Sequence, residues 1–161
     1  MPTKGIIADR RPGFEILITD RQKKIRLSKT KIRGWSIKIL KLLSVRNITL
    51  SVVLVEDKEM SRLHRQFLGI KGPTDVLAFV QKGPFLGDVV ISVETAQRRA
   101  PEFGNRWDKE LLLYLIHGIL HLLGFRDAPS KEKKKMRAKE EKILNHLLGP
   151  SWPFKKQKLL F

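Results

Sequence analysis

The sequence predicts one globular domain that contains both α-helices and β-strands. Its 161 residues are a length typical of a single domain, and a hydrophobic content of 42% is typical of a chain with a folded core. Short segments rich in β-branched residues alternate with longer segments whose apolar residues recur at helical spacing. No internal repeat or low-complexity linker interrupts this pattern, so we expect a single core within residues 1–161.

The first half of the chain predicts two strands, each followed by a helix. The strand segments are rich in β-branched residues, and the helix segments carry apolar residues three and four positions apart. Ser28 and Asp57 stand just before the two helices, where a short polar side chain can accept hydrogen bonds from the first turn. The expected elements are strands over 14–19 and 47–56 and helices over 29–43 and 58–67.

The second half predicts two short strands and three more helices. The segment Lys82-Gly83-Pro84 is typical of the tight connection that joins two neighbouring strands. Ser92 is a suitable N-cap for a short helix that follows the second of these strands. The expected elements are strands over 75–80 and 85–92, helices over 93–99, 107–123 and 131–148, and a loosely held tail over 148–161.

Positive charge is concentrated at the two ends of the chain. Residues 1–46 hold 13 Lys and Arg against 3 acidic residues, and residues 128–161 hold 10 against 3, whereas residues 47–127 hold 10 of each. A basic surface around a neutral centre is typical of a protein that binds a polyanion next to a separate site. The net charge of +17 therefore favours a nucleic acid as partner. Binding to an anionic membrane surface, or a need for solubility alone, would also account for this charge.

Composition argues against several other classes of protein. The chain has no cysteine, so it can form neither a disulfide nor a thiolate-bound metal site. It begins Met1-Pro2-Thr3-Lys4 without an apolar signal segment, and its most apolar run, Leu111 to Phe125, is too short to span a bilayer. We expect a cytoplasmic protein that does not associate with membranes.

The stretch HGILHLLGFRD, residues 117–127, carries two histidines four positions apart. On a helix both rings lie on one face, about 6 Å apart along the axis. The surrounding residues, LLLYLIHGILHLLGF, are apolar on almost every side, so we expect a buried helix whose imidazoles need partners. The partners are either a metal ion, for which this spacing is typical, or carbonyl and hydroxyl groups of the core.

Two glycines and an aspartate favour the metal. Gly118 costs roughly 1 kcal/mol relative to alanine inside a helix, so we expect another element to pack closely against it. Gly124 can end the helix in a left-handed conformation, which lets the carboxylate of Asp127 return to the imidazoles. Two histidines and one carboxylate leave one position of a zinc ion open, as in catalytic sites. Taken alone, Asp127 also fits a loop residue or a cap of the last helix.

Three motifs follow one another in the middle of the chain. They are LHRQFLGIKGPTDVLAF over 63–79, LGDVVIS over 86–92 and HGILHLLGFRD over 117–127. In this order they resemble L-N-x-x-[FY]-R with P-T-[DN]-V-L-S-F, L-G-D-[IV]-V-I-S and H-G-x-L-H-L-x-G-Y-D-H. These are the signatures of the YbeY-type endoribonucleases, a family of ribosomal RNA maturation factors. The resemblance covers roughly residues 50 to 145.

The resemblance implies a single α+β domain, with a small mixed β-sheet packed with helices and a metal held in a cleft. Carried over by position, His117 and His121 match the first two metal ligands of the family, and Asp127 falls where its third histidine stands. We expect one divalent ion, zinc by the type of its ligands. Met136 and Glu140 on the last helix also fit the family pattern.

Three positions depart from the family pattern. Leu68 stands where the family carries an arginine tied to activity, and we expect Arg65, one turn earlier, to take over that catalytic role. His64 replaces an asparagine. Arg126 replaces an aspartate beside the third ligand, and nothing in the sequence explains that change.

The resemblance also implies a function. It implies cleavage of single-stranded RNA, in maturation of the 3′ end of 16S ribosomal RNA and in ribosome quality control, with ribosomal RNA and ribosomal particles as partners and no DNA. A metal ion at an open site lowers the pKa of bound water to about 7 and polarises a phosphate. Gly118 stands where zinc peptidases carry their glutamate base, which argues against a protease. Two alternatives stay open: a ribosome-associated RNA-binding assembly factor whose metal is structural, and a metalloprotease.

Overall fold

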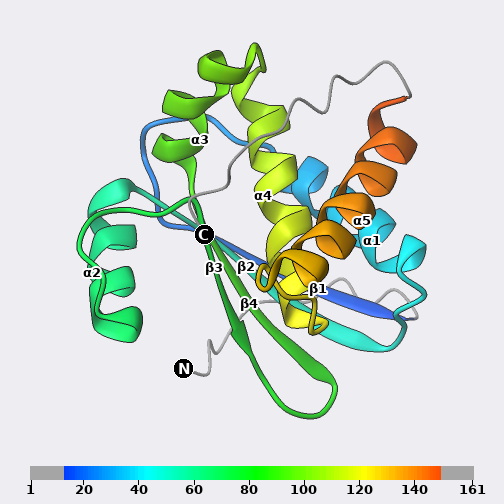
Figure 1. Ribbon diagram of the computed structural model, residues 1–161. Coiled ribbons are helices and arrows are strands. Elements are labelled where there is room, and N and C mark those ends of the chain that lie inside the picture. Colours follow the sequence, from blue (N-terminus) through cyan, green and yellow to red (C-terminus); the bar gives the residue numbers. More distant parts are fainter. Residues whose placement is uncertain (1–12, 150–161) are drawn as a thin grey trace.

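A four-stranded mixed sheet forms the centre of the molecule (Figure 1). The computed structural model describes residues 13–149, and the tail predicted over 148–161 lies almost wholly outside them. In the sheet order β1-β2-β4-β3, the first three strands are parallel and the edge strand β3 runs antiparallel to β4. All four predicted strands are confirmed. They are β1 Phe14–Asp20, β2 Ile48–Val55, β3 Val76–Val80 and β4 Phe85–Ser92.

The five predicted helices are also confirmed, within two residues at each end. The hydroxyls of Ser28 and Ser92 cap α1 and α3, as expected, by accepting hydrogen bonds from the backbone N–H groups of Lys31 and Thr95, both at 3.2 Å. A short 3-10 helix after α3 was not predicted. The helices are α1 Lys29–Leu42, α2 Asp57–Leu68, α3 Val93–Arg99, η1 Ala100–Phe103, α4 Trp107–Leu122 and α5 Ser130–Leu148.

The prediction that Asp57 caps α2 is wrong. Asp57 is the first residue of the helix, and its carboxylate accepts hydrogen bonds from the hydroxyls of Ser92 and Thr95 and from the Arg98 guanidinium, each at 2.6 Å. Burial raises the pKa of this carboxyl, but the three hydrogen bonds and the charge of Arg98 outweigh burial and hold the pKa below its usual value. Asp57 therefore connects the start of α2 to the start of α3. Its carboxylate accepts hydrogen bonds from side chains outside α2 rather than from the backbone N–H groups of its own helix.

The sheet carries a core on each face. The larger core lies between the sheet and α1, α3, α4 and α5, and a smaller one, built around Met60, lies between the opposite face and α2 (Figure 1). Strand β4 illustrates the alternation, since Val89 and Ile91 enter the larger core and Val90 the smaller. These layers form a single-domain α+β fold. Within residues 13–149, no helix has the length and apolar character needed to cross a membrane.

Helix α4 runs through the larger core, and twelve of its sixteen residues are buried. A Cβ placed on Gly118 would lie 2.5 Å from Cγ1 of Val89 and 3.1 Å from Cγ2 of Val76. The close packing predicted at Gly118 is thus confirmed, and its neighbours are strands β3 and β4. This contact fixes the rotation of α4 about its axis, and with it the direction of the histidines on either side of the glycine.

Candidate metal centre

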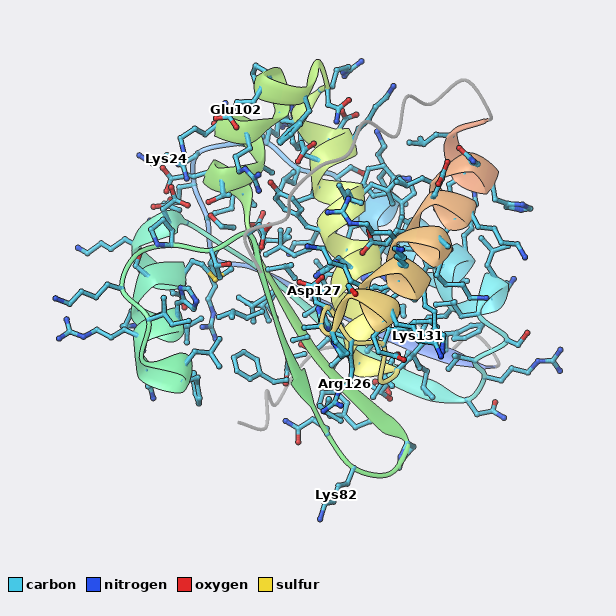
Figure 2. The ribbon with its side chains drawn as sticks, viewed as in Figure 1. Lys24, Lys82, Glu102, Arg126, Asp127 and Lys131 are labelled. Carbon is cyan, nitrogen blue, oxygen red and sulfur yellow. The ribbon has the colours of Figure 1, made fainter. Side chains whose placement is uncertain are left out.

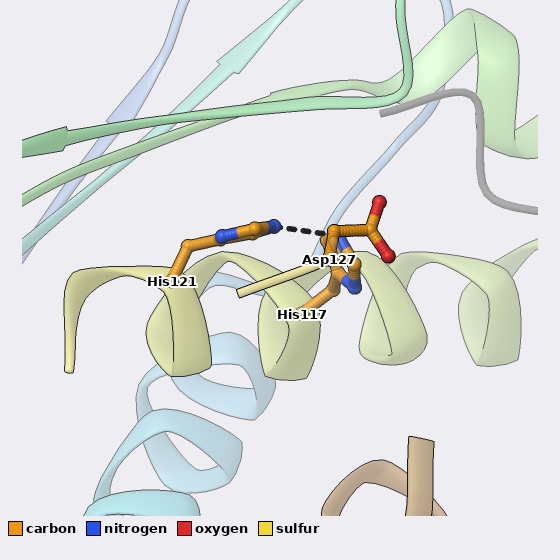
Figure 3. A group of neighbouring side chains, drawn as sticks. All are labelled: His117, His121 and Asp127. Atoms are coloured by element: carbon orange, nitrogen blue, oxygen red, sulfur yellow. Dashed lines mark hydrogen bonds between the residues drawn. The ribbon is translucent and has the colours of Figure 1, made fainter. Parts of the chain in front are cut away.

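Three side chains predicted as metal ligands converge at the C-terminal half of α4. His117 and His121 rise one turn apart from the same side of α4, and Asp127 approaches from the segment that follows the helix (Figure 3). One potential ligand atom from each residue lies within 4.8 Å of those of the other two. Ligands bound to zinc at 2.0–2.1 Å lie about 3.4 Å apart at tetrahedral angles. Small side-chain rotations therefore suffice to bring the three atoms into contact with one ion.

The turn after α4 explains how Asp127 reaches the histidines. Gly124 has φ +93°, the left-handed conformation predicted for it. Its N–H donates to the carbonyl of His121 and the N–H of Phe125 donates to that of Leu120, both at 3.0 Å, which is the hydrogen-bond pattern of a Schellman motif. The chain then reverses towards the helix. Asp127 does not cap α5, because that helix begins at Ser130 and has Pro129 at its N-cap position.

The two imidazoles face each other with their Nε2 atoms 3.0 Å apart and their ring planes at 78°. Burial and the neighbouring His117 lower the pKa of His121 to about 4, although Asp127 acts in the opposite direction. The His121 ring is therefore uncharged at neutral pH. Neutral imidazole is the form that binds a metal ion, so the electrostatics of this site suit coordination.

Glu140 on α5 orients the first of these histidines. Its Oε1 lies 2.6 Å from Nδ1 of His117, and the two residues are only 2% and 1% exposed. When Nδ1–H donates to the carboxylate, the lone pair of Nε2 is left for a metal, as in many zinc sites. This role of Glu140 was not predicted from the sequence. An available signal was the position of Glu140 on the apolar stripe of α5, four residues after Met136 and three or four before Ile143 and Leu144.

His117, Asp127 and Glu140 line a very small cavity. Its volume is about 10 Å³, room for a single ion or water molecule. Two imidazoles, one carboxylate and a supporting carboxylate form a nitrogen and oxygen donor set that fits a divalent ion such as zinc. The lining residues are His117, Asp127, Lys133, Met136, Arg137 and Glu140.

Arg65, predicted to be catalytic, lies elsewhere. It is exposed on α2 and lines a different cavity, together with Arg62, Lys71 and other residues, none of which belongs to the metal centre. Its neighbour His64 is buried, and Nδ1 of its ring lies 2.9 Å from the carbonyl oxygen of Gly72, which indicates a structural role. Arg126 is exposed, and nothing in the structure explains its presence.

Figure 2 shows how differently the labelled side chains are placed. Asp127 lies in the middle of the view, beside the start of α5, whereas Lys82 projects from the turn between β3 and β4. Asp127 is thus set against the body of the domain, whereas Lys82 lies at its periphery.

Comparisons with known proteins cover almost all of this structure. The family model described as Endoribonuclease YbeY matches residues 17–148. The chain is 36% identical over 144 residues to the endoribonuclease YbeY of Aquifex aeolicus. This alignment covers 86% of this chain and 95% of the relative. It is 34% identical over 149 residues to the endoribonuclease YbeY of Syntrophus aciditrophicus, and this alignment covers 86% of this chain and 93% of the relative.

A solved structure agrees. The solution structure of TM1509 from Thermotoga maritima superposes with a TM-score of 0.57 at 27% identity and covers 88% of this chain and 99% of that one. The matched range includes the three converging side chains and the glutamate that supports them. The chain belongs to the Endoribonuclease YbeY family.

Proposed function

We propose that this protein is a metal-dependent endoribonuclease that hydrolyses phosphodiester bonds in single-stranded RNA. The observation that carries the proposal is the convergence of His117, His121 and Asp127, three ligands that leave a position open on a bound ion. Membership of the family supports the choice of RNA as substrate. The net charge of +17 supports binding to a polyanion.

Hydrolysis adds water across a P–O bond: a new O–P bond forms, the bond to the leaving oxygen breaks, and that oxygen gains a proton. A bound divalent ion would lower the pKa of water and polarise the phosphate. His117, His121 and Asp127 would hold the ion, and Glu140 would fix the orientation of the His117 ring. We keep Arg65 as a proposed cationic contact to RNA.

The structure also bears on the metalloprotease alternative. Zinc peptidases of the HExxH type place a glutamate base immediately after the first histidine. Residue 118 holds that position here, and it faces Val89 and Val76 at distances that leave no room even for a Cβ. The peptidase mechanism therefore lacks its base at the expected place.

The finer parts of the proposal concern the metal, substrate and place of action. We propose zinc as the ion, from its nitrogen and oxygen ligands. We propose ribosomal RNA as the substrate, with action in maturation of the 3′ end of 16S ribosomal RNA and in ribosome quality control in the cytoplasm. The support for this substrate and this place of action is the resemblance of three sequence motifs to those of a family of ribosomal RNA maturation factors.

One assay tests the proposal against its alternatives. Purified protein is incubated with single-stranded RNA, the same RNA as a duplex, DNA, casein and ribosomal RNA, each with chelator, without chelator and after zinc is restored. We expect cleavage of single-stranded RNA that the chelator abolishes and zinc restores. Salt-sensitive RNA binding without cleavage under every condition would instead identify an assembly factor, and digestion of casein a protease.

A further inference from the structure

Two cations on α5 face the metal centre. Lys133 and Arg137 are one turn apart and line the same cavity as His117 and Asp127. They share a face of α5 with Met136 and Glu140, because positions 133, 136, 137 and 140 repeat at helical spacing. The face that carries the glutamate supporting His117 thus also carries two positive charges.

Burial and position together distinguish these two cations from their neighbours. Lys133 and Arg137 are half-buried, whereas Lys131, Lys134 and Lys135 on the same helix are exposed. Lys139 is also half-buried, but it does not line the cavity. Neither Lys133 nor Arg137 has an ion-pair partner among residues 13–149, while Lys135 pairs with Glu132. Desolvating a cation is unfavourable unless an anion compensates it, so such placement favours a negatively charged ligand beside these two side chains.

A count of charges identifies the kind of ligand. A divalent ion contributes +2, and the carboxylates of Asp127 and Glu140 beside it contribute −2. Lys133 and Arg137 then leave the cavity with an excess of +2. A phosphodiester carries a charge of −1, and attack by hydroxide brings the phosphoryl group to −2. The hydroxide already carries its charge before attack, so the total charge does not change. Attack moves this charge onto the non-bridging oxygens of the phosphate, and cations beside those oxygens therefore interact more strongly with the transition state than with the ground state.

We propose that Lys133 and Arg137 bind the non-bridging oxygens of the phosphate that is cleaved and stabilise the charge that develops on them. The guanidinium of Arg137 can donate two parallel hydrogen bonds, and Lys133 supplies a compact charge. This inference rests on the proposed function, but it assigns the cations of the reaction to α5 rather than to Arg65 on α2.

The competing view is that the two cations only neutralise Asp127 and Glu140. Under that view, replacing both with glutamine would leave the carboxylates of Asp127 and Glu140 uncompensated and would lower the thermal midpoint of the metal-free protein, while the affinity for anions stayed unchanged. Under the proposal, the affinity for phosphate falls and the metal content remains at the wild-type level.

The experiment uses the metal-loaded full chain and compares two double variants that lose the same charge. Lys133→Gln/Arg137→Gln alters the cavity, and Lys58→Gln/Lys82→Gln alters exposed positions on α2 and on the β3–β4 turn. Calorimetry at fixed ionic strength measures the affinity for inorganic phosphate, and a labelled single-stranded RNA gives kcat and KM. Metal content and the thermal midpoint are measured on every variant. Arg137→Lys, which keeps the charge but loses the paired donors, is added as a milder change.

We expect the cavity variant to bind phosphate at least about tenfold more weakly and to lose about 10²-fold in kcat, the range found when a group that stabilises an oxyanion is removed. The exposed pair should stay within about twofold of wild type, and Arg137→Lys should lie between the two. Equal losses in both pairs, or an unchanged phosphate affinity in the cavity pair, would overturn the proposal. If the wild type binds phosphate through these residues but cleaves no RNA, the anion site stands and the proposed function fails.

Discussion

Asp127 reaches the metal centre from a short turn, without the support of a helix or strand. We predict that Asp127→Ala loses the metal, because two imidazoles alone are too few ligands to hold a divalent ion firmly. Asp127→His should retain it, since imidazole is an equally good zinc donor and Gly124 still turns the chain back. Elemental analysis of protein purified without added metal gives the number of ions per chain.

The stability of the metal-free protein separates this role from a capping role. A true N-cap residue costs about 1 kcal/mol when it is replaced by alanine. Because Pro129 occupies the N-cap position of α5, we expect the midpoint of metal-free Asp127→Ala to match that of the metal-free wild type. A variant that keeps its metal and only melts earlier would show that Asp127 is not a ligand.

Glu140 would act on a bound metal through its contact with His117. We predict that Glu140→Gln weakens metal affinity by about 10- to 100-fold, because the amide accepts the hydrogen bond from Nδ1 less strongly and no longer raises the basicity of Nε2. Glu141→Gln on the exposed side of the same helix is the matched control and should change nothing. Competition with a chelator of known affinity measures the metal affinity of both variants. Equal metal affinities in the two variants would contradict the role given to Glu140.

The convergence of the three candidate ligands was predictable, because it depends on local spacing. They lie within eleven residues, so helix geometry and one glycine turn bring them together. The supporting contact between His117 and Glu140 spans 23 residues and two helices, and helical periodicity alone does not say which faces meet. The error at Asp57 has the same origin, since its partners at the end of β4 and on α3 lie 35 to 41 residues away.

At the scale of elements, the packing of α4 on the sheet sets the direction of the ligands. We predict that Gly118→Ala destabilises the protein, because overpacking against Val89 costs about 1–3 kcal/mol and exceeds the roughly 1 kcal/mol gained in helix propensity. Metal affinity should fall as well, since α4 must shift. Chemical denaturation and a metal titration measure the two effects.

Two further variants make this prediction specific. Gly34→Ala on α1 is the matched control, because a Cβ there would meet no atom within 4 Å, and it should stabilise the protein by up to about 1 kcal/mol. Val89→Ala makes room, so Gly118→Ala should cost less in a Val89→Ala background than in the wild type. A cost that is independent of residue 89 would show that the loss at Gly118 has another cause.

The elements themselves were well predicted, and their arrangement was not. Periodicity and caps predicted all four strands and five helices, because these signals are local. Only η1 was missed, since its single turn, with Pro101 near the start, is too short to produce a period. The order β1-β2-β4-β3 and the division of helices between the two faces depend on long-range packing, for which the sequence alone has no comparable signal.

At the scale of the whole molecule, the basic ends of the chain are expected to hold RNA and the metal centre to cut it. We predict a steep decrease of RNA affinity with salt, with a slope of log affinity against log salt of about −0.7 for each phosphate neutralised on a single strand. Lys131 and Lys134 are exposed at the start of α5, close in sequence to the cations of the cavity but outside it. Lys131→Glu/Lys134→Glu should therefore flatten the slope by about 1.4.

Lys58→Glu/Lys82→Glu, which removes the same charge from the neutral middle of the chain, should lower affinity slightly without a comparable change in slope. Fluorescence anisotropy of a labelled RNA over a range of salt concentrations measures both slopes. Equal slopes in the two variants would mean that the lysines of α5 are a solvated helix face and that RNA is held elsewhere.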